Sequence, residues 1–372
     1  MKLTKIFRAL LLAAGLAPAC ATAQTTDALV ATLQHGDETK VFTGTDAFIN
    51  AYNAAADSAD IITLSSGRFA EVHKIEKSIT VYGAGFEEDT ITGAKPTILF
   101  DNSSGQNWMR IMHKKVEIED EDGYKQQTIQ KSDGCKFEGI LFSEIVNITH
   151  NSLGVEHRNI HFVKCKFNSS MYLDNFIYNL LISQCVFDDG INKTAGTLYN
   201  SLITNSIIQS DYFLDLRNNS DDNDNKNTLL VDHCILCHTG TPSYKYEHIR
   251  GTCTCTNSIL ILNNYYPSTN TVTYKNNIII GTNNIVEDCW TGLAKKSVFA
   301  SAEEDGSYAA NRTFELKYPN KYIGTDGTQV GVHGGRYPWN KIPATPRIVE
   351  SNIDTETSAE GKLKVSIKVE AH

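Results

Sequence analysis

Acidic, basic and aromatic side chains in two short stretches could contact an anionic sugar. One stretch reads Met-Tyr-Leu-Asp and ends at Asp174; the other reads Tyr-Phe-Leu-Asp-Leu-Arg and includes Phe213, Asp215 and Arg217. Apolar and polar residues alternate in both, which is typical of strands that bury one face and expose the other. We expect these four side chains to face solvent, with Asp174, Phe213 and Asp215 as substrate contacts.

The same residue types match the needs of a lyase that cleaves a uronic-acid polysaccharide. Such an enzyme must neutralise the sugar carboxylate, and calcium held by several oxygen ligands can do so. Asp174, Asp189 and Asp215 are the candidate calcium ligands. Arg217 is the candidate base for the proton beside the sugar carboxylate, a role for Arg or Lys that is implied by the family resemblance described below. Binding without catalysis would require no cofactor.

A glycoside hydrolase fits less well. It needs two carboxylates at a defined separation, and Asp174 and Asp215 lie two repeats apart, about 9.6 Å by the strand spacing. No local motif matches a lyase or hydrolase signature, so the sequence leaves enzymatic activity open. The run 218–225, rich in Asn and Asp, is more typical of a solvated loop than of a calcium site.

One group of residues has the composition of a zinc site: His233, Cys234, Cys237, His238, Cys253 and Cys255. The repeat pattern assigns Cys234 and Cys255 to inward positions and Cys237 to an outward one. Three ligands that point to different sides cannot share one ion. Packing or a local disulfide is therefore favoured over zinc.

The elements that position these residues are indicated by a repeat. An apolar residue, two polar residues, a small residue, any residue and an apolar residue recur at steps of 19 to 28 residues. The small positions are Cys165, Cys185, Ser206, Cys234, Ser258 and Asn277. Short strands of this kind can bury their apolar face only by stacking on neighbouring copies. The cysteines among them are predicted to be packed free thiols, since stacked Cβ atoms lie too far apart for a disulfide.

The repeat, with the segments 60–69, 75–85 and 324–335, resembles the right-handed parallel β-helix of the pectate-lyase-like superfamily. The resemblance spans about Asp60 to Gly335 and implies an all-β, single-stranded right-handed parallel β-helix. It is nearly silent on function, because many activities and plain binding roles share one scaffold.

Aligned repeats also assign columns of side chains. Apolar columns before and after the small residue should point inward. A bend column, whose Asn residues tolerate left-handed backbone, comprises Gln184, Asn205, His233, Asn257 and Asn276. An outward apolar column comprises Val186, Ile207, Ile235, Ile259 and Ile278. Cover by the tail or by long loops is favoured for it, with a partner interface as the alternative.

Both ends of the stack should carry caps. Residues 45–56 predict a short amphipathic helix with Thr45 as N-cap, within a cap region of about 45–57. Residues 347–353 and 363–369 predict a tail hairpin that covers the last coil or its side. The expected organisation is a signal peptide (1–23), a β-helix (24–336, coils about 60–335) and a hairpin tail (337–372).

The N-terminus predicts export. A basic start, an apolar stretch from Ala9 to Ala19 and an Ala-Thr-Ala site at 21–23 are typical of a signal peptide. The expected location is periplasmic, outer-surface or secreted. The predicted tail hairpin resembles the tails of exported β-helix proteins of Gram-negative bacteria, which implies such a source. Lipidation of Cys20 is the alternative, and only that would attach the chain to a membrane.

The charge argues against nucleic acid. Removing residues 1–23 takes the formal charge from −9 to −12, whereas nucleic-acid affinity depends on Lys and Arg contacts to phosphate. The expected function is an exported polysaccharide-associated protein that binds or processes glycan. A calcium-dependent lyase and a structural or adhesive surface protein are the alternatives. The sequence does not specify the oligomeric state.

Overall fold

The computed structural model describes residues 29–56, 58–90, 93–102, 108–119, 124–149, 155–217, 227–239, 248–262, 271–282, 284–344, 347–353, 361–362 and 365–370. The expectations for the signal peptide, for Cys20 and for the loop 218–225 lie outside these residues. None of the described helices is long and apolar enough to cross a membrane.

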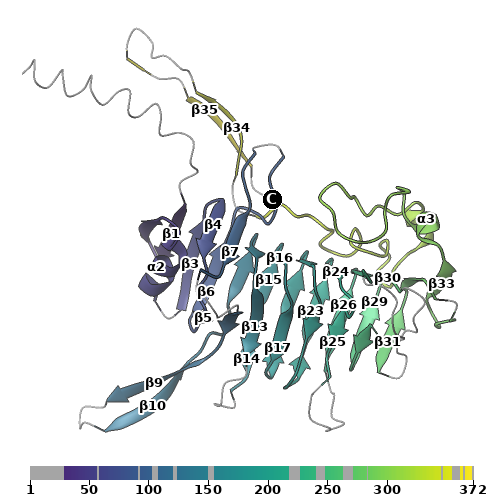
Figure 1. Ribbon diagram of the computed structural model, residues 1–372, viewed down its shortest axis with the longest axis horizontal. Coiled ribbons are helices and arrows are strands. Elements are labelled where there is room, and N and C mark those ends of the chain that lie inside the picture. Colours follow the sequence, from purple (N-terminus) through teal and green to yellow (C-terminus); the bar gives the residue numbers. More distant parts are fainter. Residues whose placement is uncertain are drawn as a thin grey trace, which may run out of the picture.

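Three long sheets form the body of the molecule (Figure 1). The eleven-stranded sheet has the order β2 (Glu38–Thr43), β1 (Val30–His35), β3 (Ser58–Leu64), β6 (Ser78–Tyr82), β11 (Lys136–Glu138), β15 (His161–Val163), β19 (Leu181–Ser183), β23 (Ser201–Thr204), β26 (Leu229–Asp232), β29 (Cys253–Thr256) and β31 (Val272–Lys275). The ten-stranded sheet has the order β33 (Trp290–Leu293), β32 (Ile278–Ile280), β30 (Ile259–Ile261), β27 (Ile235–Cys237), β24 (Ile207–Gln209), β20 (Val186–Phe187), β16 (Lys166–Phe167), β12 (Leu141–Phe142), β7 (Thr97–Phe100) and β4 (Gly67–Ala70). The seven-stranded sheet has the order β28 (Ile249–Arg250), β25 (Leu214–Asp215), β21 (Ile191–Asn192), β17 (Met171–Asp174), β13 (Ile145–Thr149), β8 (Trp108–Ile111) and β5 (Lys74–Ile75).

Smaller elements complete the fold. A three-stranded sheet comprises β14 (His157–Arg158), β18 (Ile177–Tyr178) and β22 (Leu198–Tyr199). Two separate antiparallel hairpins comprise β9 (Lys114–Glu119) with β10 (Lys125–Gln130), and β34 (Arg347–Ile353) with β35 (Val365–Glu370). The helices are α2 (Ala47–Ala54), α3 (Lys295–Val298) and the 3₁₀ turn η1 (Pro319–Lys321).

The chain passes through the sheets in a fixed rotation. Strands β15, β16 and β17 belong in turn to the eleven-, ten- and seven-stranded sheets, and β19, β20 and β21 repeat that order. We call each such passage a circuit. Strands of successive circuits pair in parallel, so the chain is an all-β protein of long parallel sheets with few helices.

The predicted inward columns are confirmed. Phe162, Ile182, Ile203 and Val231 pair in one register, and Phe167, Phe187, Ile208 and Leu236 in another, all fully buried. The rings of Phe167 and Phe187 stack with their centroids 4.5 Å apart. Alternation along each strand sends these side chains to one face, and the parallel register places each on its own copy.

The small-residue ladder is also buried and serves the backbone. The Cys185 amide donates to Ser206 Oγ at 3.0 Å, and the Cys234 amide donates to Ser258 Oγ at 2.9 Å. These side chains satisfy N–H groups at the bends, where no strand partner is available. All eight described cysteines are free. Burial raises the pKa of the Cys135 thiol to about 12, so it is an inert packing group.

The bend column adopts left-handed backbone as predicted, with φ between 47° and 56° at its five positions. The structure adds a second role that the sequence did not suggest. The side chains of this column bind residues 294–344, which we call the return segment, as it runs back towards the first circuits. Asn276 donates to the carbonyl of Ile323 at 3.0 Å, Asn205 to those of Val332 and Gly334 at 2.9 and 2.8 Å, and Gln184 to that of Pro338 at 2.9 Å.

The return segment passes very close to His233. A Cβ at Gly334 would lie 2.5 Å from His233 Nδ1, so only glycine fits there. The His233 ring contacts Asp326 through Nε2 at 3.2 Å. The glycines near residue 334 therefore allow the segment to lie directly on the bend column.

The outward apolar column is covered, which confirms the favoured prediction of cover over a partner interface. All five of its residues are fully buried. They pack under the return segment, principally under Phe299, Phe314, Tyr322 and Val332. The cover is therefore provided by the return segment and not by the terminal hairpin.

Two predictions about the ends need correction. Helix α2 forms and packs on the first strands, but Asp46, not Thr45, occupies the N-cap and makes no side-chain capping hydrogen bond. Strands β34 and β35 do pair, yet Figure 1 shows their hairpin beyond β7, at the opposite end from the last circuit. The return segment carries the chain back along the stack, which places the hairpin there.

Candidate functional site on the seven-stranded sheet

The outward face of the seven-stranded sheet presents a continuous row of polar and aromatic side chains. Pairing aligns one residue from each of six strands: Arg110, Asn147, Tyr172, Asn192, Asp215 and Arg250. Asn147 is buried and the other five are half-buried. Inward neighbours such as Met109, Leu173 and Leu214 are fully buried and fix the orientation of the row.

An aromatic platform lies at one end of this row. The rings of Trp108 on β8 and Tyr172 on β17 are nearly parallel, with their centroids 5.4 Å apart and an interplanar angle of 15°. The Arg110 guanidinium lies 5.8 Å from the Trp108 ring centroid. Asn147, on the strand between, donates to Asp174 Oδ2 at 3.3 Å. The platform thus combines flat apolar surface with hydrogen-bonding groups.

The structure corrects the alignment of Asp174 with Asp215. Asp215 pairs with Asn192, which pairs with Tyr172, so Asp174 lies two residues further along its strand. The turn before β25 explains the shift. Five residues separate Ile208 from Leu214, whereas three separate Phe187 from Ile191.

Phe213 does not face solvent as predicted; it is fully buried. It belongs to the longer turn, and its amide donates to the carbonyl of His248 at 2.9 Å. Its ring stacks on that of His248 with a centroid distance of 5.0 Å. Strand alternation begins only at Leu214, so it does not apply to Phe213.

Asp215 and Arg217 form a bidentate pair. Arg217 donates through Nε at 2.8 Å and Nη2 at 2.7 Å, and Arg250 donates to the same carboxylate at 3.2 Å. Burial opposes ionisation of Asp215, but these hydrogen bonds and charges outweigh it and hold the carboxyl pKa below its usual value. Arg217 is held by this ion pair, which stabilises its protonated form. This makes it poorly suited to act as a general base.

Asp174 and Asp189 also have partners within the chain. Asp174 Oδ1 accepts from the Thr194 amide at 2.9 Å and from its hydroxyl at 2.6 Å. Asp189, an exposed residue, accepts from Ser170 Oγ at 2.6 Å. The structure does not gather Asp174, Asp189 and Asp215 into one group of metal-binding atoms.

A buried lysine lies beside the row and was missed at the sequence level. Lys193 is 3% exposed and follows Asn192. Burial lowers its pKa to about 8, although the charges of Asp174 and Asp215 act in the opposite direction. Its ammonium donates to the carbonyl of Gly196 at 2.9 Å. No motif marks this residue; only the sheet geometry places it there.

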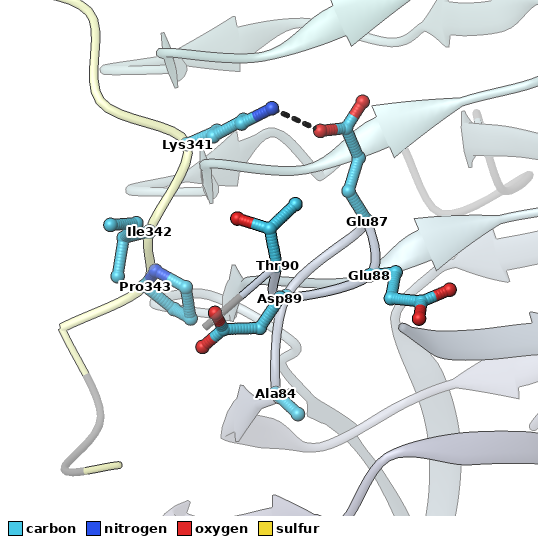
Figure 2. Close-up of a pocket in the computed structure, with 9 residues that line it drawn as sticks. Ala84, Glu87, Glu88, Asp89, Thr90, Lys341, Ile342 and Pro343 are labelled. Atoms are coloured by element: carbon cyan, nitrogen blue, oxygen red, sulfur yellow. Dashed lines mark hydrogen bonds and ion pairs between the residues drawn. The ribbon is translucent and has the colours of Figure 1, made fainter. Parts of the chain in front are cut away.

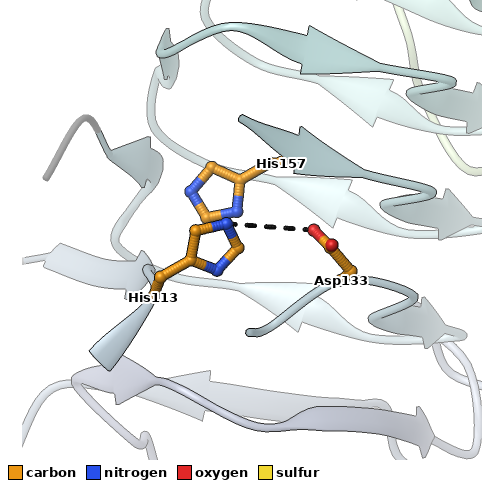
Figure 3. Close-up of side chains that lie close together, drawn as sticks. All are labelled: His113, Asp133 and His157. Carbon is orange, nitrogen blue, oxygen red and sulfur yellow. Dashed lines mark ion pairs between the residues drawn. The ribbon is translucent and has the colours of Figure 1, made fainter. Parts of the chain in front are cut away.

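Two groups of possible metal ligands occur elsewhere among the described residues, and neither includes the Cys and His residues for which zinc was considered and disfavoured. The first comprises His113, Asp133 and His157 (Figure 3). The two rings lie with centroids 4.1 Å apart. His113 Nε2 contacts the carbonyl of Glu156 at 3.0 Å, and His157 Nε2 contacts that of Thr149 at 3.3 Å. Burial and the neighbouring His113 lower the pKa of His157 to about 3, as for a neutral packing residue.

The second group comprises Glu71, His73 and Asp101 at the turn between the ten- and seven-stranded sheets. Burial raises the pKa of Glu71 to about 8, with Asp101 and Glu144 adding to the effect. Three carboxyl groups thus lie close together at a turn where burial limits their contact with water.

A crevice lies where the return segment meets the first circuits (Figure 2). Ala84 to Thr90 form one side and Lys341 to Pro343 the other, and Lys341 pairs with Glu87. Its volume is about 120 Å³, well below the roughly 300–1,000 Å³ of ordinary ligand pockets. We assign it to packing of the segment.

No family model, curated protein or solved structure matches the chain. Its function must therefore be argued from the geometry of its own residues.

Proposed function

We propose that the chain is an exported, single-stranded right-handed parallel β-helix that binds an anionic polysaccharide along the outward face of its seven-stranded sheet. The observation that carries the proposal is the Trp108–Tyr172 platform, continuous with the polar row. Flat aromatic rings offer apolar surface for sugar rings, and amides and carboxylates beside them can bind hydroxyl groups.

The length and charge of the row favour a polymer that bears carboxylates. Six strands at about 4.8 Å spacing extend over about 24 Å, which accommodates several sugar units. Arg110 and Arg250 contribute guanidinium groups, which match carboxylates in fork geometry. A uronic-acid glycan is accordingly the proposed ligand class.

Export and location belong to the same proposal. The basic and apolar N-terminal segment supports export, and lipidation at Cys20 remains the alternative route to a surface location. A structural or adhesive role has lost its main support, because the apolar column on which it depended is covered.

The test is binding of the mature protein to polygalacturonate and alginate, with dextran as the neutral comparison. Trp108→Ala and Tyr172→Ala should each weaken binding about fivefold, since stacking of an aromatic side chain contributes on the order of 1 kcal/mol. Tyr178→Ala is the matched control, because Tyr178 stacks on Tyr199 at 4.5 Å on the three-stranded sheet, away from the row. Equal losses in all three variants, or no binding, would refute the proposal.

The same samples test catalysis. Ultraviolet absorbance from unsaturated sugar ends, measured with calcium and with a chelator, reports lyase activity. Calcium-dependent product that disappears in Asp215→Ala would establish the lyase alternative and a role for calcium. The bidentate Asp215–Arg217 pair favours binding without cleavage.

A further inference from the structure

Three potential ligands converge at the turn that follows β4 and β7. Glu71 comes directly after β4 and Asp101 directly after β7, and the pairing of Ala70 with Phe100 places the two acids side by side on adjacent circuits. His73 lies two residues after Glu71. One ligand atom from each of Glu71, His73 and Asp101 lies within 4.8 Å of those of the other two.

The imidazole of His73 lies between the carboxylates of Glu71 and Asp101, and one of its two ring nitrogens can bind a given ion. His73 Nδ1 lies 3.3 Å from Glu71 Oε1, and His73 Nε2 lies 3.5 Å from Asp101 Oδ1. When two ligand atoms each lie about 2.0–2.1 Å from a tetrahedrally coordinated ion, the distance between the two ligand atoms is about 3.4 Å. The distance of 3.3 Å between His73 Nδ1 and Glu71 Oε1 matches this separation, so Nδ1 is the nitrogen that faces the proposed ion.

Glu71 supplies an independent indication. Its side chain is 2% exposed, and Oε1 has no hydrogen-bond partner among the described residues. A buried carboxylate oxygen without a donor is costly. Asp101, whose side chain is 5% exposed, and the half-buried Glu144 on the next circuit add negative charge at the same turn. A cation would satisfy the oxygen and offset the repulsion.

We propose that Glu71, His73 and Asp101 bind one divalent first-row metal ion, such as Zn²⁺ or Mn²⁺. The mixed imidazole and carboxylate donors suit such ions better than an all-oxygen set would. The His73 side chain is 29% exposed and gives the ion a route from solvent. The ion links the first two circuits, and this site is independent of the proposed glycan face.

The other group of possible ligands is less suited to a metal. Its His113 and His157 contact backbone carbonyls through Nε2, and Ser132 contacts the Nδ1 atom of each ring. A metal there would displace hydrogen bonds that are already formed. Asp133 belongs to the group of His113 and His157, outside the proposed site, and provides a matched control.

The experiment uses the mature protein after chelation and dialysis. Zn²⁺ and Mn²⁺ are added separately, and stoichiometry is measured by calorimetry and elemental analysis, with Tm measured in parallel. We expect one ion per chain and a Tm that rises with metal concentration. Glu71→Gln and Asp101→Asn should lower the affinity by more than about tenfold, while Asp133→Asn leaves it unchanged.

Two outcomes would overturn the proposal. One is metal binding that survives in Glu71→Gln or is lost in Asp133→Asn. The other is an absence of Zn²⁺ and Mn²⁺ binding by the wild-type protein. A wild-type or higher Tm in Glu71→Gln would then show that a proton on Glu71 relieves the repulsion. Glu71→Gln nearly preserves shape, and its metal-free Tm reports whether it folds.

Discussion

At the scale of single residues, the charged side chains predicted to contact ligand already make hydrogen bonds within the protein. Asp174, Asp215 and Arg217 are all engaged in hydrogen bonds on the seven-stranded sheet. Such side chains are pre-organised to bind a ligand without moving. The buried histidines, by contrast, serve packing.

His157 gives a pH prediction at this scale. Its folded pKa of about 3 lies below the ordinary value of 6.5, so the unfolded chain binds more protons between these limits. Stability is therefore fully present above about pH 6.5 and is lost as pH falls towards 3.

The measurement is the free energy of unfolding in urea across that pH range. His157→Asn should reduce the slope by up to about 1.4 kcal/mol per pH unit relative to wild type. His333→Asn, on the return segment, controls for loss of a histidine as such. An unchanged slope in His157→Asn would show that its ring does not carry this acid sensitivity.

At the scale of elements, the return segment is the main feature that repeats alone do not imply. It covers the apolar column, principally with Phe299, Phe314, Tyr322 and Val332, and its backbone between residues 323 and 338 binds the bend column. One stretch of chain thereby serves as side cover and as a clamp along the stack.

Asn205 tests this clamp. Its amide donates to the carbonyls of Val332 and Gly334, and its φ is 47°. Asn205→Gly keeps the left-handed backbone and removes both hydrogen bonds, so we expect a loss of about 1–3 kcal/mol in the free energy of unfolding.

Limited proteolysis of the return segment should accelerate in the same variant. Asn179→Gly is the control, since Asn179 has φ 59° and its amide group, among the described residues, bonds only the side chains of other asparagines. Equal effects of the two substitutions would mean that the amide-to-segment bonds contribute nothing measurable.

At the scale of the whole molecule, stability depends on contacts between successive circuits. The aromatic stack of Phe142, Phe167 and Phe187 crosses three of them with centroid distances of 4.9 and 4.5 Å. In a stacked architecture each unit is stabilised mainly by its neighbours.

Phe167→Ala should therefore cost about 3–5 kcal/mol and uncouple the two halves of the stack. Unfolding followed by circular dichroism in urea should broaden or split into two transitions. Phe176→Ala, at a site 43% exposed, should leave one transition. A single transition of unchanged steepness in Phe167→Ala would argue that the stack does not transmit cooperativity.

Sequence alone was enough to identify the inward columns, the small-residue ladder, the left-handed bends and the need to cover the apolar column. These features depend on strand alternation and on contact between adjacent repeats, which a repeating pattern records directly. The short cap helix was predicted for a similar local reason.

Tertiary structure decided the remaining features. Two additional residues in one turn moved Asp215 out of line with Asp174 and buried Phe213. The path of the return segment joins residues more than a hundred positions apart, and the Glu71–His73–Asp101 group and the Trp108–Tyr172 platform each need two or more circuits in register. Loop length and long-range packing set these arrangements, and neither leaves a periodic signal in the sequence.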